Sequence, residues 1–97
     1  MSDSMFPLGR ILATLGALDA LNKADVQPQS LLSRHANGDW GCVCEDDKRA
    51  NEAALIDGSR ILSAYVLPTE IKIWIITEAV DDKGQRAATT LMLPEDY

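Results

Sequence analysis

Residues 60–77, RILSAYVLPTEIKIWIIT, decide the fold because they read as two strands joined by a tight turn. Arg60 to Leu67 and Ile71 to Thr77 are rich in the β-branched and aromatic side chains that favour extended backbone. Pro68-Thr69-Glu70 forms a connection short enough for two antiparallel neighbours. The stretch therefore predicts a β-hairpin with strands over 60–67 and 71–77.

A third strand is expected after this hairpin. Asp81-Asp82-Lys83-Gly84 supplies the next turn, and residues 87–93 return as a strand that ends at Pro94. Because helical patterns come first and strand patterns last, the sequence predicts an α+β fold. In this fold two to three N-terminal helices pack on a C-terminal three-stranded antiparallel meander. With 97 residues, 46% of them hydrophobic, the chain is expected to form one domain over residues 1–97.

Helical periodicity dominates the first part of the chain. Leucine and isoleucine recur at steps of three and four between Leu8 and Leu21, and Pro7 suits a first helical turn. Pro28 can open a second helix, and Gly58 can end a third whose alanine-rich side suits close packing on a sheet. Helices are expected over residues 8–21, 28–36 and 46–57.

Charge and hydropathy restrict the partners and the compartment. Fifteen acidic residues against nine basic ones give a net charge of −6, which repels a phosphate backbone and makes nucleic acid an unexpected partner. No apolar run reaches the length of a membrane span, so no membrane partner is expected. The first residues lack the basic and apolar regions of a secretory signal. We therefore expect a cytoplasmic protein.

Neither a metal nor a cofactor is expected from the motifs. Cys42 and Cys44, together with His35 and Asp39, supply only one closely spaced pair of thiols, whereas a structural zinc site usually uses two pairs of ligands. A disulfide between cysteines two positions apart would be strained, and a reducing cytoplasm opposes it. The sequence contains no P-loop, no dinucleotide-binding glycine pattern and no Gly-X-Ser-X-Gly motif.

One set of polar residues suggests a catalytic alternative. His35 is the only histidine, so it could serve as the acid or base of a metal-free ribonuclease. Arg60 and Arg86 would then hold the phosphate and Tyr65 would assist. We favour the other interpretation, in which His35 ends a helix and bonds a carbonyl. The arginines, Arg34 among them, then pair with carboxylates in solvent.

Aromatic residues define a candidate binding surface. Lys72, Trp74 and Ile76 share one face of the second predicted strand, and three helices often leave one sheet face uncovered. Trp40 is expected to close the core from a loop, and we include it with these three residues in the candidate surface. A protein partner or a second copy of the chain would bury such a face. The alternative for Trp74 is packing in the core beneath a helix.

Several motifs along the chain resemble those of a known family. They are LGRILAT at 8–14, RH at 34–35, GDWG at 38–41, RILSAY at 60–65, KIWIITE at 72–78 and TTLMLPEDY at 89–97. Together they resemble small uncharacterised bacterial proteins that are associated with plasmids and other mobile elements ("plasmid-related protein"). The resemblance covers nearly the whole chain and implies no catalytic activity. A restriction-modification label carried by some relatives does not suit a chain too short for a methyltransferase domain.

These observations favour a small non-enzymatic accessory or protein-binding module from a mobile element. The alternative is a metal-free ribonuclease or toxin-like enzyme of barnase- or RelE-like architecture. That alternative rests on the order of helices and strands, which is an analogy of fold alone.

Overall fold

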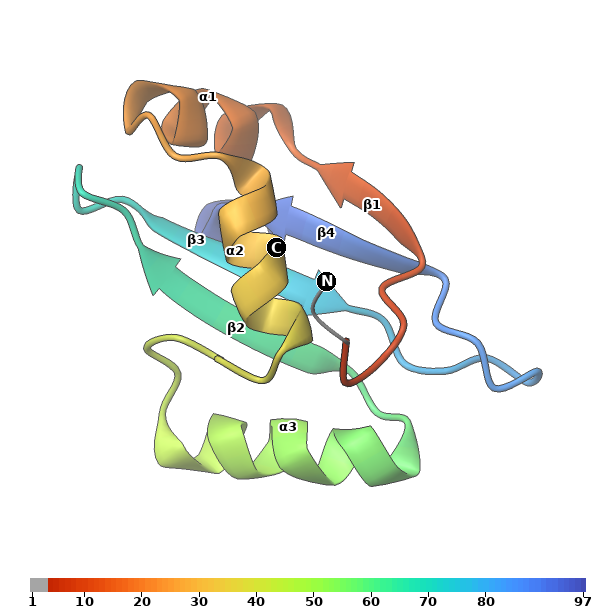
Figure 1. The fold of residues 1–97 in the computed structure, drawn as a ribbon. Coiled ribbons are helices and arrows are strands. Elements are labelled where there is room, and N and C mark those ends of the chain that lie inside the picture. Colours follow the sequence, from red (N-terminus) through yellow and green to blue (C-terminus); the bar gives the residue numbers. More distant parts are fainter. Residues whose placement is uncertain (1–3) are drawn as a thin grey trace.

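A mixed four-stranded sheet forms the centre of the protein, as the computed structural model of residues 4–97 shows (Figure 1). The elements in chain order are β1 (Arg10–Ala13), α1 (Leu15–Lys23), α2 (Pro28–Ala36), α3 (Glu45–Asp57), β2 (Ile61–Val66), β3 (Lys72–Thr77), β4 (Ala88–Met92) and the 3₁₀ turn η1 (Pro94–Asp96). The predicted α+β class is confirmed. The observed bounds of five elements lie within one residue of the predicted bounds, because strand alternation and helix-end signals are local; these elements are α2, α3, β2, β3 and β4.

The predicted three-stranded antiparallel meander is wrong. The strand order is β1-β4-β3-β2, so a fourth strand joins the sheet. β2, β3 and β4 pair antiparallel, whereas β1 pairs parallel with β4 from Arg10↔Ala88 to Ala13↔Leu91. The sheet is therefore mixed, and the helices do not simply precede the strands.

The predicted helix over 8–21 is wrong in its first half. Gly9 has a φ of +66°, and a Cβ there would lie 2.3 Å from the Arg86 carbonyl oxygen, so the chain runs against β4 at this point. That approach places the next residues in extended pairing with β4. The helix begins only after Thr14, whose hydroxyl accepts the Ala17 N–H at 3.1 Å as an N-cap.

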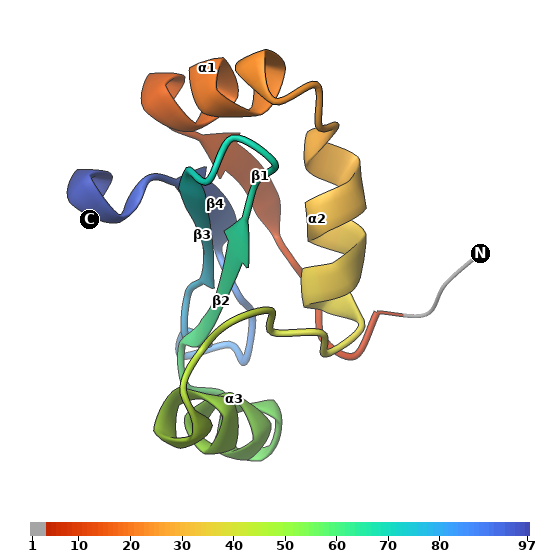
Figure 2. The same ribbon diagram turned by 90° about the vertical axis from the view of Figure 1, so that its left-hand side faces the viewer.

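The helices cover the two faces of the sheet unequally (Figure 2). α2 lies on what we call the inner face, and α1 lies across the top of the sheet in this view. Both helices enclose the main core with β2, β3 and β4. The buried residues of this core are Ala17, Ala20, Leu21, Leu31, Tyr65, Leu67, Ile73, Ile75 and Leu91. η1 and the C-terminus lie on the opposite, outer face, and α3 runs along the β2 side of the sheet.

Two segments close the free edge of β2. The Asn51 side chain of α3 accepts the Leu62 N–H at 2.9 Å and donates to the Leu62 carbonyl at 2.6 Å. Beside it, the Ala64 N–H donates to the Trp40 carbonyl at 3.0 Å, and the Ala64 carbonyl accepts the Cys42 N–H at 2.8 Å. These bonds occupy the outward backbone groups that Leu62 and Ala64 would otherwise offer to another chain.

The closed edge gives a first prediction. Asn51→Ala should lower the free energy of unfolding by about 2 to 4 kcal/mol, because two backbone groups of Leu62 lose their partners in a partly buried place. Urea denaturation measures the difference. Glu52→Ala, at the exposed neighbouring position, should change stability by less than about 0.5 kcal/mol. Equal effects of the two variants would show that Asn51 does not hold the edge.

Candidate functional site

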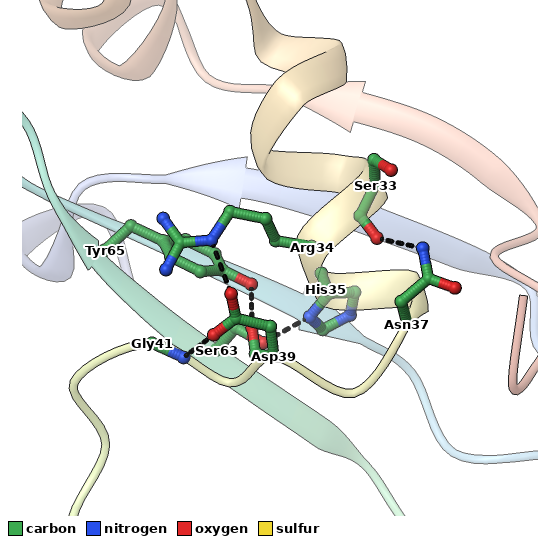
Figure 3. Close-up of polar contacts among 8 residues, drawn as sticks. All are labelled: Ser33, Arg34, His35, Asn37, Asp39, Gly41, Ser63 and Tyr65. Carbon is green, nitrogen blue, oxygen red and sulfur yellow. Dashed lines mark hydrogen bonds and ion pairs between the residues drawn. The ribbon is translucent and has the colours of Figure 1, made fainter. Parts of the chain in front are cut away.

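A chain of hydrogen bonds crosses the inner face of the sheet beneath α2. His35 is fully buried, and its Nδ1 lies 2.5 Å from the Ser63 hydroxyl oxygen on β2 (Figure 3). Its Nε2 lies 2.8 Å from the Thr77 hydroxyl on β3. Thr77 in turn lies 2.7 Å from the Thr89 hydroxyl on β4, which donates to the Leu8 carbonyl at 2.7 Å. The chain therefore links α2 to three strands and to the segment before β1.

The end of this chain fixes the protonation of the imidazole. The Leu8 carbonyl can only accept a hydrogen bond, so Thr89 donates its one hydroxyl proton to that carbonyl. Thr77 must then donate to Thr89, and His35 Nε2 must donate to Thr77. Nε2 of His35 therefore carries a proton. Because the pKa of His35 is lowered by burial, the imidazole is neutral near pH 7, and its Nδ1 accepts the Ser63 O–H.

Burial sets the acidity of His35. Loss of solvent, which is the larger cause, and the positive charge of Arg86 together lower the pKa of this imidazole to about 4. The prediction that His35 bonds a carbonyl is wrong, since both of its ring nitrogens contact hydroxyl groups. The last carbonyls of α2 accept N–H groups of the following turn: the Gly38 N–H donates to the His35 carbonyl, and the Asp39 N–H donates to the Arg34 carbonyl. A Ser–His contact of this kind can activate a nucleophile. Here both side chains are fully buried, so the contact is inaccessible to substrate.

Above the buried chain lies a polar cluster at the surface (Figure 3). Arg34 Nε donates to Asp39 Oδ2 at 2.7 Å, and the Arg34 guanidinium lies 4.6 Å from the centre of the Tyr65 ring. Tyr65 donates its hydroxyl to the Asp39 carbonyl at 2.6 Å, and Asp39 Oδ1 accepts the Gly41 N–H at 3.2 Å. The Arg34 hydrogen bond lowers the pKa of Asp39, and burial raises the pKa of Tyr65 to about 12. These contacts hold the 38–41 turn against β2.

The four residues of the ribonuclease alternative occupy separate environments. His35 and Arg86 are buried, and Arg86 donates to the carbonyls of Ser59, Glu78 and Ala54. Tyr65 is held by the 38–41 turn on the inner face, whereas Arg60 is exposed and contacts Tyr97. The structure does not bring these side chains to one open cleft. The predicted grouping of Arg34, Arg60 and Arg86 is likewise not formed, because each guanidinium bonds a different part of the chain.

The four residues of the candidate binding surface also lie in different environments. Trp40 is 5% exposed and packs beside Phe6 and His35, so it closes the core from its loop as expected. Lys72, Trp74 and Ile76 share the outer face, since their partners on β2 alternate with the inward Ile61, Ser63 and Tyr65. Ile76 is buried, Trp74 is partly exposed and Lys72 is exposed.

The sequence interpretation did not identify the residues that accompany Trp74. Its ring meets the Tyr97 ring edge to face, with centroids 5.9 Å apart, and Met92 is its neighbour on β4. Arg60 donates a hydrogen bond to the Tyr97 hydroxyl, and its guanidinium lies 5.5 Å from the Tyr97 ring centre. We call Lys72, Trp74, Met92 and Tyr97 the outer-face cluster. An aromatic residue shortly after Pro94 was the available signal for Tyr97.

Cys42 and Cys44 are exposed free thiols. In the described part of the chain, residues 4–97, His, Cys, Asp and Glu side chains nowhere gather in threes around a possible metal position. The helices of the same part are too short or too polar to cross a bilayer.

Compared with models of known protein families, with curated proteins and with solved structures, the chain matches none.

Proposed function

We propose that this protein is a small non-enzymatic protein-binding module that contacts its partner through the outer-face cluster. The observation that supports this most directly is the edge-to-face contact of Trp74 with Tyr97 over a sheet face that carries no α-helix (Figure 2). Tyr97 is 72% exposed, and Met92 and Trp74 are partly exposed beside it. Aromatic and methionine side chains in such a setting are enriched where proteins bind one another.

Charge indicates what the partner presents. Although the protein carries a net charge of −6, Arg10, Arg60 and Lys72 all lie on or beside the outer face. A partner with carboxylates around an apolar centre would match this arrangement, because opposite charges at the rim favour encounter and register. We therefore propose a protein partner with an acidic rim. We also propose a cytoplasmic location and, on the resemblance of the motifs, association with mobile elements.

The disposition of the catalytic candidates supports binding over catalysis. Each hydroxyl of the Ser63–His35–Thr77–Thr89 chain already has a partner, and the three Arg86 contacts are with backbone carbonyls. A general base must reach the proton that it removes. In the outer-face cluster, by contrast, Lys72 and Tyr97 are exposed, and Trp74 and Met92 are partly exposed.

Photo-cross-linking in cells tests this proposal. A benzophenone amino acid at Lys72 should give a discrete cross-linked product with another protein, and adding Tyr97→Ala should weaken that product several-fold. Ile56→Ala, which removes a 91% exposed apolar side chain from α3, is the matched control and should leave the product unchanged. A product that is insensitive to Tyr97→Ala, or the absence of any product, would contradict the proposal.

An RNA-cleavage assay with the purified protein tests the enzymatic alternative. The purified protein should leave a mixed RNA pool intact in the presence of EDTA. Cleavage that disappears in His35→Ala would overturn the binding-module proposal in favour of a metal-free nuclease.

A further inference from the structure

The two edge strands of the sheet, β1 and β2, differ in whether their outward backbone groups have hydrogen-bond partners. β2 is closed by Asn51 and the 40–42 segment, as described above. On β1, the N–H groups of Arg10 and Thr14 donate to Ala87 and Leu91 on the β4 side. The backbone groups of Ile11 and Ala13 therefore point outward, since successive residues of a strand alternate. No strand of the described residues 4–97 pairs with that outer side.

Side chains do not protect this open edge. Ile11 is 46% exposed, Leu12 is 42% exposed and Leu15, just after the strand, is 85% exposed. Natural edge strands usually avoid unwanted pairing through charges, prolines or bulges. β1 has Arg10 as its single charged residue and no proline. An apolar edge with free backbone groups is thus suited to pair with another strand.

We propose that a second copy of this chain pairs with β1 in antiparallel orientation about a two-fold axis. Ile11 of one copy then exchanges both backbone hydrogen bonds with Ala13 of the other, and Leu12 faces Leu12 across the axis. Gly9, with its φ of +66°, leaves the extended conformation just before Arg10, where the strand begins. The two sheets become one continuous sheet. This interface differs from the outer-face cluster and does not rest on it.

Charge complementarity supports a second copy of the chain as the partner that pairs with β1. Asp96 is held at the end of β1 by the Thr14 hydroxyl at 2.7 Å and by the Leu93 N–H at 3.1 Å. Arg10 forms no ion pair with any side chain of residues 4–97. Within one chain, Arg10 and Thr14 are about 13 Å apart along the strand. Across the two-fold axis, Arg10 faces Thr14 of the other copy, beside the Asp96 carboxylate, and the symmetry makes this contact twice.

Sedimentation velocity over a wide concentration range tests the inference. The 10.6 kDa chain should shift toward twice its mass as concentration rises, because a short strand pairing gives a reversible dimer. Leu12→Lys and Leu12→Glu should each be monomeric, since like charges would face each other across the axis. An equal mixture of the two variants should dimerise again.

Val66→Lys is the matched control, because Val66 is 56% exposed on the closed edge strand β2. It should dimerise as the unmodified protein does. A monomer at every concentration, a Val66→Lys variant as defective as Leu12→Lys, or a mixture of Leu12→Lys and Leu12→Glu that stays monomeric would each overturn the inference. Tyr97→Ala should leave the dimer intact, which separates this result from that of the outer-face cluster.

Discussion

Arg86→Met should lower the free energy of unfolding by about 4 kcal/mol or more, the largest effect that we expect from a single substitution. Arg86 is 6% exposed, and its guanidinium donates to Ser59 at 2.8 Å, to Glu78 at 2.8 Å and to Ala54 at 3.1 Å. Methionine keeps the apolar stem but leaves three poorly solvated carbonyls without this donor. The three carbonyls belong to Ala54 in α3, to Ser59 just before β2 and to Glu78 just after β3. Loss of the guanidinium therefore weakens the contacts among these three elements.

Urea denaturation followed by circular dichroism measures this effect. Arg86→Lys keeps the charge, but its single nitrogen cannot replace both guanidinium nitrogens, which bond Ser59 and Glu78 from one and Ala54 from the other. It should therefore cost less than Arg86→Met and stay folded. Arg49→Met, at a side chain that is 75% exposed and 3.8 Å from Asp46, should change stability by less than about 0.5 kcal/mol. If Arg86→Met were as stable as Arg49→Met, the guanidinium would have no structural role.

Acidification should remove about 3 kcal/mol of stability through His35 alone. The pKa of His35 is about 4 in the folded protein and close to 6.5 in an unfolded chain. Between these values the unfolded chain binds more protons, so stability rises with pH. The contribution of His35 is complete above about pH 6.5 and is lost as pH falls to 4. Protonation would place a second positive charge near Arg86 and break the Ser63 O–H to Nδ1 bond.

Two measurements check this pH dependence. An NMR titration of the imidazole should give a midpoint near 4, well below that of an exposed histidine. Urea denaturation at a series of pH values should show a slope between 6.5 and 5 that His35→Gln removes, since the chain has no other histidine. An imidazole midpoint near 6.5, or an equal slope in His35→Gln, would contradict the buried hydrogen-bond chain.

The sequence determined the parts of the fold that depend on neighbouring residues. β2, β3 and β4 lie within the predicted ranges 60–67, 71–77 and 87–93, because β-branched alternation acts within each strand. Local signals also mark the helices: α2 begins at Pro28, and α3 has acidic residues in its first turn and ends at Gly58 in the left-handed conformation. The shared face of Lys72, Trp74 and Ile76 follows from the two-residue repeat of a strand.

Tertiary structure decided the identity of β1. The residues Arg10–Ala13 carry a leucine and isoleucine spacing that also fits a helix. They become a strand because Gly9 lets the chain approach Arg86, far along the sequence, and because β4 supplies a partner. No local pattern encodes that partner, so the mixed sheet and its open edge could not be predicted.

The environment of His35 likewise came only from the assembled fold. Its partners lie 28 and 42 residues away, at Ser63 and Thr77, and spacing along the chain gives no sign of either contact. The sequence identified a single histidine near a helix end but left open whether it faces solvent or the core. Packing of α2 on the sheet resolved this, because burying the neutral imidazole required hydroxyl partners that only the neighbouring strands supply.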